Sequence, residues 1–401
     1  MKLSQKIDAC ELSPIRKFYP DIVAAERRGI RIHSLNIGQP DIRTPEQYFE
    51  ALANYRQDVL AYAPSPGIPS LIEAVQRYYA RLGERLDAGD ILITTGGSEA
   101  LLMAMQCILD EGCEVIVPEP FYPNYKTFIH MAGGEIRPLQ TAPENGYRYA
   151  DRALLEPLIA EKTRAILVTN PGNPTGTVLT ERELRLIADI AKEHDLYLIC
   201  DEVYREFIYD GGHLTTAASL RDMDENLILI DSVSKRFSAC GARIGALISR
   251  NRAFIEAALK IAQARLSVAT LDQVGAAALY SVDPSYFEAT REEYQRRRDV
   301  CYRKLREIPG VVTIEPKGAF YTMAKLPVDD AERFQSFLLR EFSVDGETVV
   351  FAPGNGFYAT PDAGKSEIRI AYVRCCEELE RALDLLRLAI EAYNKKNKKN
   401  K

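Results

Sequence analysis

Residues 232–245 read Ser-Val-Ser-Lys-Arg-Phe-Ser-Ala-Cys-Gly-Ala-Arg-Ile-Gly and connect two apolar, strand-like runs, Leu227 to Ile230 and Ile244 to Ser249. Lys235 follows two serines in this segment, and Arg243 stands eight positions after it. A lysine close to a second cation loses part of its affinity for a proton, and the free amine then condenses with carbonyl groups. The alternative is an ordinary basic loop. Both interpretations are compatible with this segment, and motifs elsewhere in the chain distinguish them.

The chain has 401 residues, a formal net charge of −6 and eight cysteines. This length exceeds that of one compact core, so we expect two or three domains. The mild negative charge argues against a nucleic-acid-binding surface. The cysteines form no Cys-x-x-Cys pair and have no histidines at metal-binding spacing, which indicates reduced thiols and no metal site.

The N-terminal sequence Met-Lys-Leu-Ser-Gln-Lys contains no apolar core of signal-peptide length. No later apolar run is long enough to cross a bilayer. We therefore expect a cytoplasmic protein that binds neither membranes nor nucleic acid.

Strand-like and helix-like segments alternate between residues 91 and 249. The predicted strands are Ile91–Thr95, Glu114–Pro118, Glu135–Leu139, Ala165–Thr169, Leu196–Cys200, Leu227–Ile230 and Ile244–Ser249. The predicted helices among and before them are Ile15–Arg28, Leu71–Leu82, Ser98–Leu109, Tyr122–Met131 and Glu181–His194. Such alternation predicts an α/β fold with a mostly parallel seven-stranded sheet that is covered by helices on both faces.

The pattern changes after residue 251. The chain is predicted to be helical through Arg265, and again from Gln273 into a long charged helix that ends near Ile308. Shorter strands and two helices follow, at Val311–Ile314, Ala319–Ala324, Asp330–Glu341, Ile368–Ala371 and Glu377–Tyr393. This composition predicts a smaller α+β domain. We divide the chain into an N-terminal arm with part of the small domain (1–45), a large domain (46–287) and a C-terminal small domain (288–401).

Polar residues follow the predicted strands at the edge where open parallel sheets bind ligands. Gly97 and Ser98 follow the first strand and begin a helix, whose free N–H groups favour a phosphate. The same residues are also a common way to start a helix. The run Asn170-Pro-Gly-Asn173-Pro-Thr-Gly176 offers amide donors to a ligand or forms a rigid turn.

Asp201 stands at the tip of an all-apolar strand. A buried carboxylate requires hydrogen bonds or a cation, and a protonated pyridine nitrogen is such a cation; helix capping is the alternative. Tyr122 follows another strand and either stacks on a planar ring or packs in the loop. Gly38 lies in a short Ile37-Gly-Gln-Pro40 segment, where a plain turn is favoured.

The order of these motifs resembles the class I and II aminotransferases of fold type I, which depend on pyridoxal 5′-phosphate (PLP), and most of all the aspartate aminotransferases. The matching elements are Gly97-Ser98, Tyr122, Asn170-Pro-Gly-Asn173-Pro-Thr-Gly, Asp201-x-x-Tyr204, Ser232-x-Ser-Lys235 and Arg243, and the resemblance extends from about Asn36 to Arg369. It implies the PLP-dependent transferase fold. It also implies ping-pong transfer of an amino group from an L-amino acid, expected to be aspartate or glutamate, to a 2-oxo acid.

The resemblance implies a role for each matching residue. Lys235 would bind the PLP aldehyde and later move the substrate proton. Asp201 would keep the pyridine nitrogen protonated, while Asn173 and Tyr204 would donate hydrogen bonds to the phenolate oxygen of the ring. Tyr122 would stack on the ring.

The resemblance also implies which residues bind the phosphate of PLP and the substrate. The phosphate would be held by Gly97, Ser98, Ser232, Arg243 and, from a second subunit, Tyr62. The residues Arg369, Asn173 and Gly38 would bind the α-carboxylate of the substrate. Because Tyr62 would act across a two-fold interface, the resemblance implies a homodimer.

Arg265 is the candidate for binding a side-chain carboxylate. Its position relative to Lys235 matches where aspartate aminotransferases place an arginine that crosses from the partner subunit. The alternative is a solvated arginine at a helix C-terminus, and Arg43, close to the Gly38 turn, is a competing candidate. The chain departs from many relatives in having Gly241-Ala242 before Arg243 and no tryptophan, which leaves the pocket shape open.

Other functions fit the same scaffold. A PLP-dependent C–S β-lyase shares the early chemistry, and a transaminase for aromatic or aliphatic amino acids shares all of it. A regulator built on a transaminase-like domain would need a DNA-binding module, for which the 35 residues before Asn36 are too few.

Overall fold

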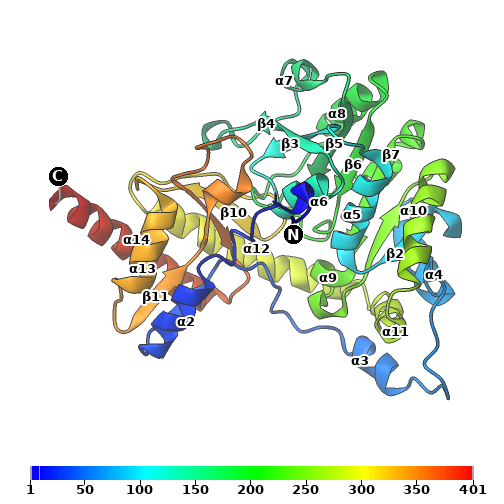
Figure 1. The fold of residues 1–401 in the computed structure, drawn as a ribbon. Helices are drawn as coiled ribbons and strands as arrows, with labels where there is room; N and C mark the ends of the chain where they lie inside the picture. The colour runs from blue at the N-terminus through cyan, green and yellow to red at the C-terminus, as the bar shows by residue number, and fades with distance from the viewer. Residues whose placement is uncertain (1, 9, 400–401) are drawn as a thin grey trace.

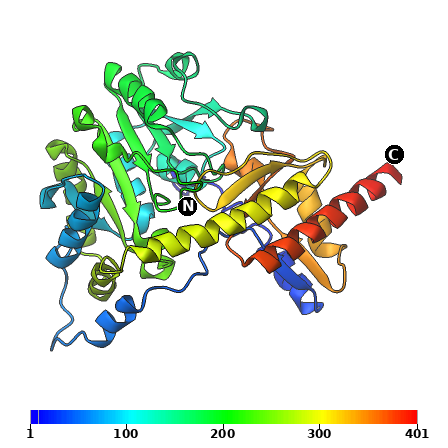
Figure 2. The same cartoon turned by 180° about the vertical axis from the view of Figure 1, so that it is seen from behind.

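The computed structural model describes residues 2–8 and 10–399 (Figure 1). A seven-stranded sheet with its helices forms one part of the molecule, and a four-stranded and a two-stranded sheet lie in the other. The long helix α12 (Ser285–Arg306) runs from the first part to the second (Figure 2). In the described part of the chain, no helix is long and apolar enough to span a membrane.

The large sheet has the strand order β2-β8-β7-β6-β5-β3-β4. Its strands are β2 (Ile91–Thr94), β3 (Glu114–Glu119), β4 (Glu135–Gln140), β5 (Thr163–Thr169), β6 (Tyr197–Asp201), β7 (Leu227–Ser232) and β8 (Gly245–Ile248). Only β8 runs antiparallel to its neighbours in this sheet. The predicted α/β fold with a mostly parallel seven-stranded sheet is confirmed.

Successive side chains of the large sheet point to opposite faces, because the side-chain period of a strand is two. In β2, Ile91 and Ile93 pack into one core cluster and Leu92 into another. The first cluster also contains residues of α4 (Pro69–Arg81), α8 (Glu181–Glu193) and α11 (Thr270–Leu279). The second contains residues of α5 (Gly96–Ile108), α6 (Asn124–Met131) and α10 (Arg252–Arg265). Both faces are therefore covered, and ligands can reach the sheet only at its edges.

The smaller part contains two sheets. The strands β12 (Ala352–Pro353), β13 (Glu367–Ala371), β10 (Tyr321–Lys325) and β9 (Val312–Thr313) are neighbours in this order and antiparallel. Strand β1 (Arg31–Ser34) pairs in parallel with β11 (Glu347–Val350). Residues of α12, α13 (Ala331–Arg340) and α14 (Cys376–Lys399) complete this core.

Two predicted helices differ from the structure. Residues 14–18 form turns, and α2 (Tyr19–Arg27) begins four residues later than predicted. Pro20 explains this start, because proline lacks an N–H group and is tolerated in the first helical turn. The predicted continuous helix from Gln273 to near Ile308 is two helices, since α11 ends at Leu279 and α12 begins after Pro284. A proline disfavours helical backbone in the residue before it.

Several short elements had no counterpart in the sequence prediction, among them β1, β11 and the helix α3 (Glu46–Ala53). Helix α14 also continues past the predicted end at Tyr393. The division of the chain at residues 45/46 and 287/288 stays a prediction, and the break between α11 and α12 lies close to its second boundary.

Candidate active site

A cavity of about 590 Å³ lies where the carboxyl ends of the large sheet meet the smaller part of the molecule. This volume is in the usual range for sites that hold a cofactor or a small substrate. Eleven of the residues singled out from the sequence line it: Gly38, Gly97, Ser98, Tyr122, Asn173, Asp201, Tyr204, Ser232, Lys235, Arg243 and Arg369. The structure thus brings together segments that are far apart in the chain.

Lys235 lies in the short helix α9 (Val233–Arg236), directly after strand β7. The hydroxyl of Ser232 caps this helix by accepting a hydrogen bond from the Ser234 amide at 3.0 Å. The Lys235 Nζ donates to the carbonyl oxygen of Gly38 at 3.0 Å and lies 3.8 Å from the Cys240 sulfur. No carboxylate in the described chain forms an ion pair with it, so its amine is available for chemistry in the cavity.

Asp201 is the last residue of β6 and is buried. Its carboxylate accepts hydrogen bonds from the Tyr125 hydroxyl at 2.6 Å and from the Val203 amide at 3.3 Å. No cation among the described residues pairs with it. Burial therefore raises the pKa of Asp201 to about 6. A buried acid without a cation is stabilised when a cationic group enters the cavity.

Asn173, Tyr204 and Tyr321 form a chain of hydrogen bonds along one wall of the cavity. The Asn173 side-chain amide donates to the Tyr204 hydroxyl at 3.3 Å, and the hydroxyls of Tyr204 and Tyr321 are 3.0 Å apart. Burial raises the pKa of Tyr204 well above its usual value, so its phenol stays protonated and can donate. A Cβ atom at Gly38 would overlap the Tyr321 hydroxyl, which explains the glycine better than a plain turn.

The opposite end of the cavity is shaped by glycines around Arg243. Gly96 has a φ of +72°, and a Cβ atom there would lie 2.6 Å from Nη2 of Arg243. A Cβ atom at Gly245 would lie 2.5 Å from the Gly96 backbone. These glycines let the Arg243 guanidinium approach the N-terminus of α5, where N–H groups are free. The guanidinium donates to the carbonyl of Cys240 at 3.1 Å and has no carboxylate partner in the described chain, so this end suits an anion such as a phosphate.

Arg369 projects from β13 into the wall of the cavity and is only 2% exposed. Its Nη2 donates to the carbonyl of Asn36 at 2.7 Å, and its guanidinium lies over the rings of Tyr321 (4.6 Å) and Phe357 (5.0 Å). Its Nε is buried with no hydrogen-bond partner. Burial lowers the pKa of Arg369. A buried guanidinium without a carboxylate partner favours an anionic ligand.

Three residues predicted to act in the site lie outside the cavity within one chain. Tyr62 is 81% exposed in the segment between α3 and α4. Arg265 lies with Nε 3.2 Å from a carboxylate oxygen of Glu99. Arg43 is exposed and forms an ion pair with Glu46 at 2.8 Å.

The cavity also contains residues to which the sequence reasoning gave no role. Tyr321 and Asn124 are among them, as are Ser13, Ile15 and Arg16 of the N-terminal arm. The sequence contains one indication of a turn in this arm, because Pro14 and Pro20 flank a short segment that is poorly suited to a helix. Such a segment is free to form a turn at a cavity.

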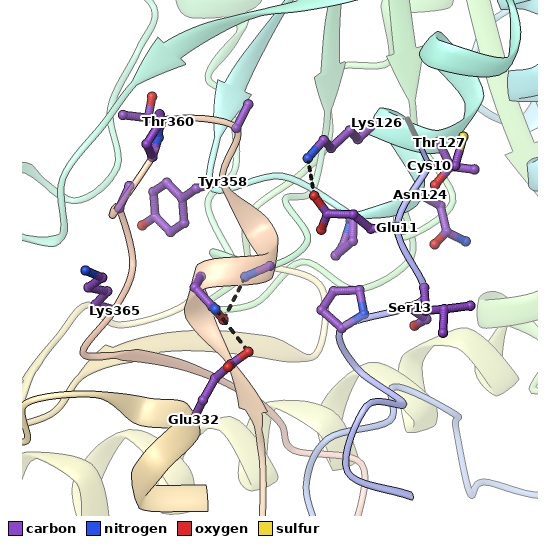
Figure 3. A pocket seen from close by; sticks show the side chains of 18 of the residues that line it. Cys10, Glu11, Ser13, Asn124, Lys126, Thr127, Glu332, Tyr358, Thr360 and Lys365 are labelled. Carbon is purple, nitrogen blue, oxygen red and sulfur yellow. Dashed lines mark hydrogen bonds and ion pairs between the residues drawn. The ribbon is translucent and has the colours of Figure 1, made fainter. Parts of the chain in front are cut away.

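A second cavity of about 550 Å³ borders the arm (Figure 3). Ser13 and Asn124 line both cavities. In the second cavity, Lys126 of α6 forms an ion pair with Glu11 of the arm at 2.8 Å. Residues of the arm therefore line both cavities, and this ion pair attaches the arm to α6.

Comparisons with known proteins find a family model, curated relatives and solved structures that are similar to this chain. The family model "Aminotransferase class I and II" matches residues 31–386. The aromatic-amino-acid aminotransferase 2 of Thermococcus litoralis and the aspartate aminotransferase of Pyrococcus abyssi are each 34% identical to the chain, over 96% of this chain and 97% of their own. The solved structure of aspartate aminotransferase from Thermus thermophilus with maleate has a TM-score of 0.88 and 30% identity, and covers 97% of this chain and 100% of its own.

Proposed function

The chain belongs to the class I and II aminotransferases, and we propose that it uses PLP to move the amino group of aspartate or glutamate to a 2-oxo acid in two half-reactions. The membership makes the protein a transaminase of fold type I. The observation that supports the finer proposal is that Lys235, Asp201 and Arg369 line one cavity while each lacks an oppositely charged partner in the described chain. PLP would supply a pyridinium nitrogen for Asp201 and an aldehyde for Lys235, and an amino acid would supply a carboxylate for Arg369.

The cavity fits PLP at each of its functional groups. The carboxylate of Asp201 matches the pyridinium nitrogen, and Arg243 with the start of α5 matches the phosphate. The amine of Lys235 matches the aldehyde, and the hydrogen-bonded pair of Asn173 and Tyr204 matches the phenolate oxygen. The residues proposed to hold PLP are Gly97, Ser98, Tyr122, Asn173, Asp201, Tyr204, Ser232, Lys235, Arg243 and Tyr62 of the partner subunit.

When bound, PLP withdraws electrons from an attached amino acid and thereby makes its Cα proton acidic. In our proposal the guanidinium of Arg369 binds the α-carboxylate, with Asn173 and the Gly38 backbone close by, and so orients the Cα–H bond. The Nζ of Lys235 then removes the proton from Cα as a general base, and the resulting ammonium group acts as a general acid. Asp201 holds the negative charge that keeps the ring nitrogen protonated.

Tyr122 forms a neutral aromatic wall in this arrangement. Burial raises the pKa of Tyr122 to about 12, so the phenol carries no charge at neutral pH. Its hydroxyl accepts a hydrogen bond from the Asn124 side chain at 2.8 Å, and its ring makes an edge contact with that of Tyr125 at 5.4 Å. These contacts hold the ring in place for stacking.

We also propose a homodimer in which each subunit completes the other's site. The segment between α3 and α4 runs out from the body of the molecule (Figure 1) and exposes Val59 (73%), Leu60 (61%) and Tyr62 (81%). Adjacent exposed apolar residues are typical of an interaction surface. The free thiols of all eight cysteines suit a reducing compartment, which supports our proposal of a cytoplasmic enzyme.

A screen of amino donors tests this proposal. Aspartate, alanine, leucine and phenylalanine are each incubated with the PLP-loaded protein and 2-oxoglutarate, and glutamate with oxaloacetate. We expect aspartate and glutamate to react fastest, with one 2-oxo acid formed for each amino group transferred. Faster reaction of phenylalanine would favour an aromatic aminotransferase. Release of pyruvate from cysteine without an added acceptor would favour a C–S lyase.

A further inference from the structure

Five charged side chains line the first cavity: Arg16, Asp201, Lys235, Arg243 and Arg369. The proposed function uses four of them and leaves Arg16 without a partner. The side chain of Arg16 has no hydrogen bond or ion pair with any residue in the described ranges 2–8 and 10–399. It belongs to the turn at residues 14–18 and is exposed.

We propose that Arg16 binds the side-chain carboxylate of the amino donor and thereby gives the enzyme its preference for dicarboxylic amino acids. This inference rests on the proposed transaminase function and specifies one residue that selects its substrate. Arginine suits the task because its planar guanidinium binds a carboxylate through two parallel hydrogen bonds.

The backbone on both sides of Arg16 is fixed against the smaller part of the molecule. Ile15 packs against a cluster that includes Phe357 and Tyr358, and Phe18 is buried in another cluster. The Nζ of Lys17 lies 2.6 Å from a carboxylate oxygen of Glu332 in α13. These contacts hold the turn at the edge of the cavity.

The part of the arm before Arg16 is attached as well. A Cβ atom at Gly356 would overlap Pro14, so glycine at this position allows the arm to approach. Glu11 forms the ion pair with Lys126 that is visible in Figure 3. A guanidinium with no partner of its own loses no internal ion pair when it binds a ligand, and a fixed backbone lowers the entropy cost of binding.

The charge balance of the cavity supports the same assignment. Four cations face one carboxylate, Asp201. The proposed phosphate and α-carboxylate would pair with Arg243 and Arg369, which leaves Arg16 as an arginine of the cavity that can bind a further anion. By contrast, Arg43 and Arg265, the arginines favoured by the sequence, are each within ion-pair distance of an acid on their own chain. Neither of these two arginines lines the cavity within its own chain.

The test compares kcat/KM for aspartate and for alanine in the wild type, Arg16→Gln, Arg16→Lys and Arg148→Gln. Arg148 is a matched control, since it is another exposed arginine without a side-chain partner and lines neither cavity. Because Arg16→Gln removes a charge-assisted contact, we expect it to lower kcat/KM for aspartate about ten- to a hundredfold. The kcat/KM for alanine should change little. Arg16→Lys should keep part of the preference, and Arg148→Gln should keep all of it.

A binding measurement gives a readout that does not depend on turnover. Calorimetry of the PLP-loaded wild type should show tighter binding of succinate than of butyrate, and this difference should shrink in Arg16→Gln by the same factor as kcat/KM. If Arg16→Gln still transfers amino groups and its ratio of kcat/KM for aspartate to kcat/KM for alanine is unchanged, the inference is overturned. If only Arg265→Leu lowers this ratio of kcat/KM values, the partner subunit's Arg265 selects the substrate, and the inference about Arg16 is overturned. Absence of amino transfer from every donor in the wild type would instead refute the proposed function.

Discussion

Nη1 of Arg369 donates a hydrogen bond to Oδ1 of Asn173 at 3.1 Å, although the two residues are 196 positions apart. Asn173 follows strand β5 of the large sheet, and Arg369 lies in β13 of the smaller part. The bond therefore joins the two parts of the molecule at the proposed position of the substrate's α-carboxylate. Because this carboxylate is common to all amino acids, the pair predicts an effect that is independent of the donor.

Replacing Arg369 by Gln should lower kcat/KM for every amino donor. Charge-assisted hydrogen bonds contribute about 1.5–3 kcal/mol each, so losing a two-point contact should reduce kcat/KM at least about a hundredfold. Steady-state kinetics with aspartate and alanine measures this effect. Arg369→Lys should be only partly active, because an ammonium group lacks the planar fork. A loss restricted to aspartate would show that Arg369 contacts a side chain instead.

Asp201→Asn should lower the rate of amino transfer by several orders of magnitude while PLP still binds. A neutral amide cannot stabilise the protonated pyridine nitrogen, and removing one charge of a buried pair typically costs about 3–5 kcal/mol. Single-turnover kinetics of the PLP-loaded variant measures the chemical step. A rate within tenfold of the wild type would mean that Asp201 only caps the backbone after β6.

Burial of the Asp201 carboxylate without a cation should destabilise the PLP-free protein. Its pKa is raised from 3.8 to about 6, so the native state keeps a proton that the unfolded state has released between these values. The contribution of Asp201 to the free energy of unfolding therefore decreases by about 3 kcal/mol as the pH rises from about 4 through about 6. Urea unfolding of the wild type and Asp201→Asn should give similar stabilities near pH 4 and a more stable variant above pH 6. Equal stabilities at every pH would contradict the assigned pKa.

Tyr62→Phe should weaken the retention of PLP without breaking the dimer. The hydroxyl is proposed to reach the phosphate bound in the other subunit, while the ring still packs at the interface. Dialysis followed by absorbance of the remaining PLP measures retention, and sedimentation velocity measures assembly. Leu60→Ser serves as a comparison, because it changes the same exposed segment without removing a phosphate ligand. A wild-type monomer with full activity would refute the composite site.

The large sheet and most of the candidate site could be predicted because their signals are local. Most strands of the large sheet are short apolar runs, and polar motifs such as Asp201 and Asn170-Pro-Gly-Asn173 stand at or just after their carboxyl ends. In a parallel sheet these motifs must meet at one edge, so their order in the chain is enough to assemble them. The strand bounds from the sequence differ from the structure by one or two residues.

The features that were not predicted depend on contacts between distant segments. Strands β1 and β11 are four residues each and acquire their partner only in the folded chain. Tyr321 enters the site because Gly38 leaves room for its hydroxyl, and nothing close to either residue in the sequence indicates this. The turn that carries Arg16 is likewise fixed by Glu332 and Gly356, more than 300 positions away.

The central claim is that Lys235 is the lysine that binds PLP, and chemical trapping tests it most directly. The protein is loaded with PLP, reduced with borohydride, digested and mapped by mass spectrometry. We expect the pyridoxyl group on Lys235, and we expect Lys235→Ala to lose both this label and amino transfer while its circular dichroism and melting temperature stay close to those of the wild type. A label on another lysine, or wild-type activity in Lys235→Ala, would contradict the account.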